Sequence, residues 1–118
     1  MKNQPFYRRL GFAWHGIVSA FQSEASFRQQ VLMACMLLAI LIWRNPPAVW
    51  WAILLTNCFL VLAAELFNTA LEHTLDHLSP EIHPSVKLAK DCSAAAVLVL
   101  SMGALLSFAA FVYSTWPV

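Results

Sequence analysis

The stretch AVWWAILLTNCFLVLAAELFNTALEHTLDH, residues 48–77, decides how the rest of the chain is understood. Residues 48–64 carry no charged side chain, and then Glu65, Glu72 and Asp76 follow on what the pattern predicts to be one unbroken helix. A charged side chain within the hydrocarbon of a membrane costs about 2.5–3.5 kcal/mol, so acids in such places usually have a function. The stretch therefore predicts a membrane helix that leads directly into a functional site.

The composition of the chain indicates a membrane protein. Of its 118 residues, 60% are hydrophobic and 11% are charged, whereas roughly 25% of the residues of soluble domains are charged. A soluble fold of this length could not bury so much apolar surface. The three cysteines lie in apolar or helical surroundings and have no spacing typical of disulfides or zinc sites. We therefore expect a single all-α integral-membrane domain, residues 1–118.

Three apolar segments predict membrane spans, at residues 27–43, 48–64 and 93–116. Each approaches the roughly 17–25 residues that a helix needs to cross a bilayer, and the first two should extend into polar sequence. Residues 5–23 repeat apolar side chains every three or four positions, which predicts an amphipathic helix in the membrane interface. A solvated tail is the alternative. The sequences RNPP, residues 44–47, and LSPEIHPSV, residues 78–86, predict the breaks between spans.

Basic residues are distributed unevenly along the chain. Arg44 alone lies between the first two spans, while the other six precede the first or the third span: Lys2, Arg8, Arg9, Arg28, Lys87 and Lys90. Cytoplasmic segments of membrane proteins are enriched in basic residues. We therefore expect the N-terminus and a loop at residues 79–92 to face the cytoplasm, together with all six carboxylates of the chain.

The acids after the second span are spaced for one helix face. Glu65 and Glu72 are seven residues apart, with Asn68 between them and Asp76 one turn beyond. Like charges at this spacing repel. A divalent cation would remove the repulsion, and Mg²⁺ is commonly held by one or two carboxylates together with phosphate oxygens. A solvated acidic face is the alternative explanation.

A second polar group precedes the third span, where Lys87, Lys90 and Asp91 lie within one helical turn or so of each other. Lysines that contact phosphate and acids that hold a metal ion are typical of phosphoryl transfer, although juxtamembrane lysines also bind lipid headgroups. Glu24 is a further acid on the same side, and Arg28, four residues later, could simply pair with it.

The sequence HTLDH, residues 73–77, is similar to the H-x-x-E-H zinc motif. Its two histidines point away from the acidic face, and no third ligand is evident, so we do not expect zinc.

Taken together, these motifs resemble the prokaryotic diacylglycerol kinase family. AELFNTALEHTLD, residues 64–76, is similar to the E-x-x-N-[ST]-A-x-E-x-x-x-D signature of the family. HPSVKLAKDCSAAAVLVLS, residues 83–101, resembles its A-K-D segment, and FAWHGIVSAFQSEASFR, residues 12–28, resembles its N-terminal surface helix. The likeness covers nearly the whole chain.

The resemblance implies a homotrimer that transfers the γ-phosphate of MgATP to a lipid hydroxyl at the cytoplasmic face of a bacterial inner membrane, with no nucleic-acid partner. Glu65 would be the general base, and Asn68 would help to position the catalytic groups. Glu24 and Glu72 would bind magnesium. The resemblance also implies a nucleotide-binding set, which consists of Glu24, Gln29, Glu72, Lys90 and Asp91. Asp76 and Arg28 are further candidates without a defined role.

The chain departs from the family pattern at two places. Gln30 stands where some members carry an acid, and the CSAAAV that follows Asp91 matches neither the diacylglycerol kinase nor the undecaprenol kinase branch. We expect diacylglycerol as the acceptor, with undecaprenol as the alternative. A small proton-coupled transporter is a third hypothesis, but such proteins place an ionisable group near the middle of a span, and the central parts of these spans lack charge.

Overall fold

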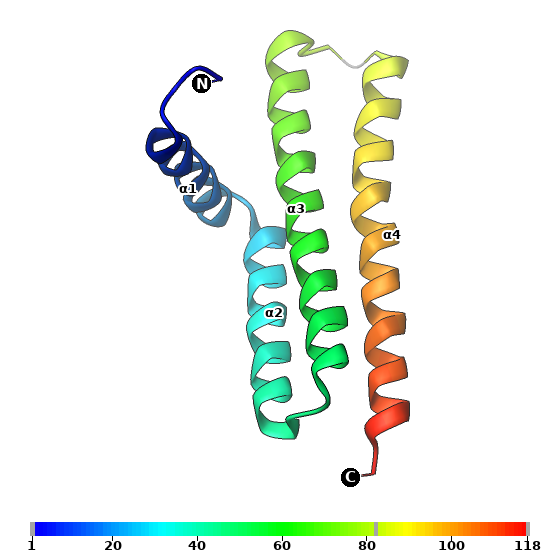
Figure 1. The fold of residues 1–118 in the computed structure, drawn as a ribbon. Helices are drawn as coiled ribbons and strands as arrows, with labels where there is room; N and C mark the ends of the chain where they lie inside the picture. Colours follow the sequence, from blue (N-terminus) through cyan, green and yellow to red (C-terminus); the bar gives the residue numbers. More distant parts are fainter. Residues whose placement is uncertain (1, 82, 118) are drawn as a thin grey trace.

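In the computed structural model, which describes residues 2–81 and 83–117, the chain forms helices joined by short connections. The helices are α1 (Phe6–Ser23), α2 (Ala25–Arg44), α3 (Ala48–Leu78) and α4 (Pro84–Thr115). Helices α2, α3 and α4 run antiparallel with α3 in the middle, and α1 turns away from them beside the C-terminal half of α3 (Figure 1). The predicted all-α fold is thus confirmed.

Helices α2, α3 and α4 are each long and apolar enough to cross a membrane, as predicted. Their apolar windows are only 11%, 17% and 6% buried within the chain, so most of their apolar surface is available to lipid or to other chains. Helices α3 and α4 contain 31 and 32 residues. At 1.5 Å per residue they are roughly 46–48 Å long, which exceeds the ~30 Å of a hydrocarbon core, so their ends must project from it.

The structure corrects the predicted loop at residues 79–92, because α4 already begins at Pro84. Proline suits the first turn of a helix, where its missing N–H is not needed and its φ is already helical. The ring Nδ1 of His83 accepts a hydrogen bond from the Ser85 amide at 3.1 Å and caps this end. Ile82, within the predicted break, lies outside the described residues. Lys90 and Asp91 therefore lie on a helix rather than on a loop.

The other two breaks are short, one residue between α1 and α2 and three residues between α2 and α3. Glu24 is the one extended residue between α1 and α2, with φ −116° and ψ 111°, and its amide donates to the Ala20 carbonyl at 2.8 Å. Asn45 ends α2 in the left-handed conformation, with φ 44°, which asparagine adopts more readily than most residues. Pro46 and Pro47 follow it, so the predicted turn at RNPP is confirmed.

The tightest packing lies at the end of the bundle that is remote from the carboxylates. Leu41, Leu54 and Phe111 form a buried cluster between α2, α3 and α4. Beside it, Arg44 Nη2 donates to the Thr115 carbonyl at 2.7 Å, and the guanidinium lies 4.7 Å from the Trp116 ring centroid. This cation–π contact and hydrogen bond tie the ends of α2 and α4 together. The remote end therefore holds the three long helices in place.

We expect Leu54→Ala to lower the free energy of unfolding by about 2 kcal/mol, the lower end of the usual range for a buried leucine. The loss is small because unfolded helices in a membrane already lie in lipid, so the substitution removes packing but little hydrophobic transfer energy. Unfolding in mixed micelles with increasing dodecyl sulfate measures it. Leu78→Ala is the matched control, since Leu78 is 73% exposed. Equal stability of the two variants would contradict the prediction.

Candidate active site

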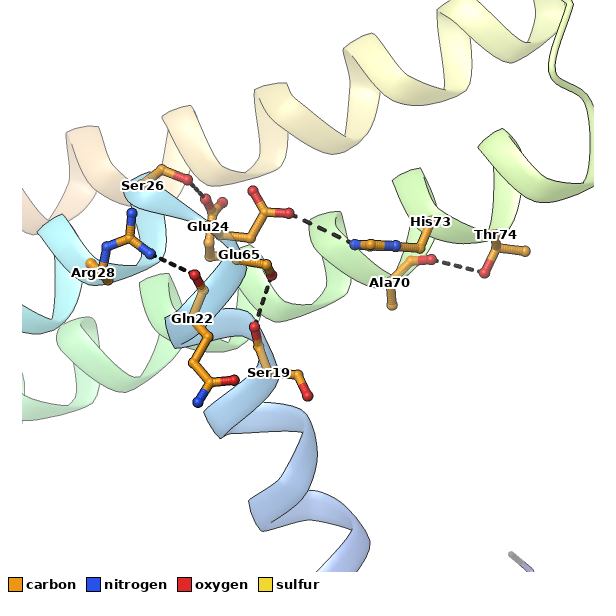
Figure 2. Close-up of polar contacts among 10 residues, drawn as sticks. Ser19, Gln22, Glu24, Ser26, Arg28, Glu65, Ala70, His73 and Thr74 are labelled. Carbon is orange, nitrogen blue, oxygen red and sulfur yellow. Dashed lines mark hydrogen bonds and ion pairs between the residues drawn. The ribbon is translucent and has the colours of Figure 1, made fainter.

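Glu65 is the only charged side chain that is buried within the described residues, at 5% exposure. It lies on α3 opposite the start of α2, where the Ser26 hydroxyl donates a hydrogen bond to Glu65 Oε1 (Figure 2). Counted from the first residue of α3, Ala48, it lies roughly 26 Å along the helix axis, which is close to the ~30 Å thickness of a hydrocarbon core. A buried carboxylate thus stands where the apolar part of α3 ends.

Glu24 points toward α3 from the junction of α1 and α2. Although Glu24 is the N-cap residue of α2, its side chain makes no capping hydrogen bond. Its Oε1 instead lies 3.8 Å from His73 Nε2 (Figure 2). Ser26, two residues after Glu24, contacts Glu65. The junction therefore brings Glu24 close to the part of α3 that carries Glu65. The sequence suggested this grouping only through the resemblance.

Arg28 braces the bend between α1 and α2. Its Nη1 donates to the carbonyl oxygens of Phe21 and Gln22, at 2.8 and 3.0 Å. These carbonyls belong to the last turn of α1, where a cation is stabilised by the helix dipole. The simple pairing of Arg28 with Glu24 that the spacing allowed is not among the ion pairs of the described residues. Arg28 therefore fixes the angle at which Glu24 is presented.

Glu72 and Asn68 extend the oxygen-rich face of α3 beyond Glu65. Glu72 is partly buried, and Asn68 Oδ1 is a buried oxygen without a hydrogen-bond partner. Buried polar atoms are normally paired, so an orphaned oxygen calls for an explanation. Carboxylate and amide oxygens are suitable ligands for Mg²⁺. The described residues contain no cluster of three or more acidic, histidine or cysteine side chains that could hold a metal ion.

Asp76 and Lys90 join α3 to α4 through an ion pair. One turn away, Lys87 Nζ lies 2.6 Å from Asp91 Oδ2, and both side chains are mostly exposed. Asp76 follows Glu65 by about three helical turns, or roughly 16 Å. Within one chain, the candidate residues thus form two groups, one beside the α1–α2 junction and one between α3 and α4.

Gln29 and its neighbour Gln30 lie in different surroundings on α2. Gln29 is exposed, whereas Gln30 is partly buried, and its Oε1 has no partner. Gln30 lines a mainly apolar groove of ≈ 360 Å³ between α2, α3 and α4. The described contacts do not bring Gln29 to the other candidates.

A second opening adjoins the Glu24–His73 contact. It lies between α1 and α3, has a volume of ≈ 820 Å³, and is lined by residues that include Ser19, Ser23, Thr69 and His73. It provides space for a small molecule or a lipid headgroup next to Glu24.

Two residues at this site were missed by sequence reasoning. His73 was set aside with the zinc-like motif, yet it contacts Glu24, and Ser26 was not considered, yet it binds Glu65. Both contacts join residues 39 or more positions apart, which no local spacing reveals. The only feature of the sequence that could have pointed to either contact was the hydroxyl of Ser26, two residues after the candidate acid Glu24.

Comparisons with known proteins identify the family to which the chain is similar. Residues 11–112 match the family model described as prokaryotic diacylglycerol kinase. The chain is 30% identical over 107 residues to a diacylglycerol kinase of Escherichia coli, covering 91% of this chain and 88% of that protein. It is 38% identical over 89 residues to one of Pseudomonas aeruginosa, covering 75% and 72%. It is 31% identical over 93 residues to one of Helicobacter pylori, covering 79% and 73%.

Proposed function

Because the chain belongs to the prokaryotic diacylglycerol kinase family, we propose that it transfers the γ-phosphate of MgATP to the hydroxyl of diacylglycerol and so forms phosphatidic acid. Family membership and three helices able to cross a membrane make it a multi-pass membrane lipid kinase. Diacylglycerol as the acceptor is our proposal, supported by the names of its relatives.

The buried carboxylate of Glu65 is the observation that carries the proposal. The hydroxyl of a membrane lipid lies at the level of the interface, so a base for it must stand where hydrocarbon gives way to water. Glu65 lies where the apolar part of α3 ends, which supports this role, and its burial would keep bulk water from competing for the proton. In the proposed step, Glu65 takes the hydroxyl proton while the lipid oxygen bonds to the γ-phosphorus. The bond from that phosphorus to the β–γ bridging oxygen breaks, and ADP leaves.

Glu24 and Glu72 would hold Mg²⁺, and the unpaired Asn68 oxygen is a further candidate oxygen next to them. When bound, the ion would neutralise phosphate charge and help to orient the transferred group. Lys90 and Asp91 would bind the nucleotide from α4. In the free chain Lys90 pairs with Asp76, which keeps the ammonium group at the α3–α4 interface until a phosphate competes for it. Gln29 remains a candidate nucleotide contact.

We propose that the active enzyme is a homotrimer, with the site at the cytoplasmic face of a bacterial inner membrane. The largely exposed apolar windows of α2, α3 and α4 support assembly with other copies. Asp76, which pairs with Lys90 of α4, lies roughly 16 Å from Glu65 along α3, and this separation supports a site completed by a neighbouring copy. The six basic residues on one side of the spans support a cytoplasmic location.

The proposal predicts magnesium-dependent labelling of a lipid by γ-³²P-ATP when the purified protein is assayed in mixed micelles. We expect diacylglycerol to be labelled faster than undecaprenol when both are present at equal mole fraction. Omission of magnesium, or addition of a chelator, should abolish the labelling. Faster labelling of undecaprenol would replace the proposed acceptor and leave the kinase reaction intact. Labelling of neither lipid would overturn the proposed reaction.

A further inference from the structure

The hydrogen bond from Ser26 to Glu65 is the contact that reaches the proposed base. It joins the second residue of α2 to the middle of α3 and is a side-chain contact between residues 39 positions apart. Among the hydrogen bonds of the described residues, it is the one that reaches the Glu65 carboxylate. The orientation of this carboxylate therefore depends on one hydroxyl group.

A single donor on one carboxylate oxygen has a definite chemical consequence. The Ser26 hydroxyl donates to Glu65 Oε1, so Oε2 is the carboxylate oxygen that has no hydrogen bond among the described residues and is the more available one to accept a proton. Without the donor, the carboxyl group could rotate about its terminal torsion, which is broad and roughly two-fold for glutamate. A base must lie within hydrogen-bond reach of the proton that it removes, so loss of a fixed orientation reduces the fraction of productive encounters.

The position of Ser26 adds an electrostatic contribution. Ser26 lies in the first turn of α2, a helix of 20 residues whose N-cap side chain makes no capping bond. The first amide groups of a helix carry partial positive charge, which stabilises a nearby carboxylate. Both the hydroxyl and the helix end therefore help to hold the Glu65 side chain in one orientation against α2.

We propose that Ser26 is a positioning residue for the general base, holding Glu65 Oε1 so that Oε2 faces the lipid hydroxyl. This inference rests on the proposed function of Glu65. It assigns to Ser26 no contact with either substrate, so its removal should slow the chemical step without weakening substrate binding.

The matched substitutions are Ser26→Ala, Ser26→Thr and Ser114→Ala. Threonine keeps the hydroxyl, and the exposed position of Ser26 leaves room for the extra methyl group. Ser114 is the control, because it is an exposed serine near the end of α4 that is remote from the carboxylates. All three proteins are first compared for unfolding in mixed micelles, which separates lost activity from lost fold.

We expect Ser26→Ala to lower kcat by about tenfold or more, the scale of a hydrogen bond to a charged group, with KM for ATP and for lipid within about twofold. Ser26→Thr should regain most of the rate, and Ser114→Ala should match the parent chain. In a Glu65→Gln background, Ser26→Ala should cause no further loss, since the carboxylate to be oriented is gone.

The outcomes separate this inference from the proposed function. If the parent chain labels lipid and Ser26→Ala keeps its kcat, the positioning role of Ser26 is refuted while the kinase reaction stands. A loss in Ser26→Thr equal to that in Ser26→Ala, or a full additional loss in the Glu65→Gln background, would show a purely structural role and would also refute it. Failure of the parent chain to label any lipid would overturn the proposed function, and this inference with it.

Discussion

Replacing Glu65 with glutamine is expected to lower the rate of lipid phosphorylation by about 10²- to 10⁴-fold, the range for removal of a general base. Glutamine has nearly the same shape and can still accept the Ser26 hydrogen bond through its carbonyl oxygen, but it cannot take a proton. The effect should fall on kcat, while KM for ATP changes little, because Glu65 acts on the lipid hydroxyl. Initial rates with γ-³²P-ATP and saturating diacylglycerol measure it.

Glu81→Gln is the matched control for this substitution. It removes the same charge from an exposed residue between α3 and α4, so any effect of net charge alone would appear there as well. The fold of both variants is checked by unfolding in mixed micelles. A Glu65→Gln enzyme that retains a tenth or more of the parent kcat would rule out Glu65 as the base.

The helices of this chain follow from local patterns, and the sequence therefore predicts them well. An uncharged run followed by acids at helical spacing predicts α3 beyond the apolar segment, and RNPP predicts the turn before it. The sequence pattern places the start of α4 too late, because it treats Pro84 as part of a break. A proline in the first turn begins a helix equally well.

The contacts at the site depend on how the helices pack, and local patterns do not predict them. Residue spacing places Glu65 and Glu72 on one face of α3, but only the bend at Glu24 brings α1 and α2 against that face. The same bend explains why Arg28 binds carbonyl oxygens of α1 instead of Glu24, and why His73 has a partner at all. Contacts between different helices depend on the angle at which the helices cross, and residue spacing within one helix does not predict that angle.

Replacing Glu72 with glutamine is expected to lower phosphate transfer by about 100- to 1,000-fold, because it removes a proposed magnesium ligand worth several kcal/mol of charge stabilisation. An amide oxygen is a weaker ligand than a carboxylate but occupies the same place. The loss should therefore shrink as magnesium is raised, and the magnesium concentration for half-maximal rate should increase about tenfold or more. Rates measured over a magnesium titration at fixed ATP test this.

The magnesium dependence distinguishes the roles of the two glutamates on α3. A Glu65→Gln enzyme should lose rate at every magnesium concentration, since its defect is in proton removal, whereas Glu72→Gln should recover part of its rate at high magnesium. Because both substitutions remove one charge from the same helix face, a general change in surface potential would affect the two titrations equally. Identical magnesium curves for the two variants would contradict the assignment of Glu72 as a ligand. They would leave the cation to be held by Glu24, at the α1–α2 junction, and by phosphate oxygens.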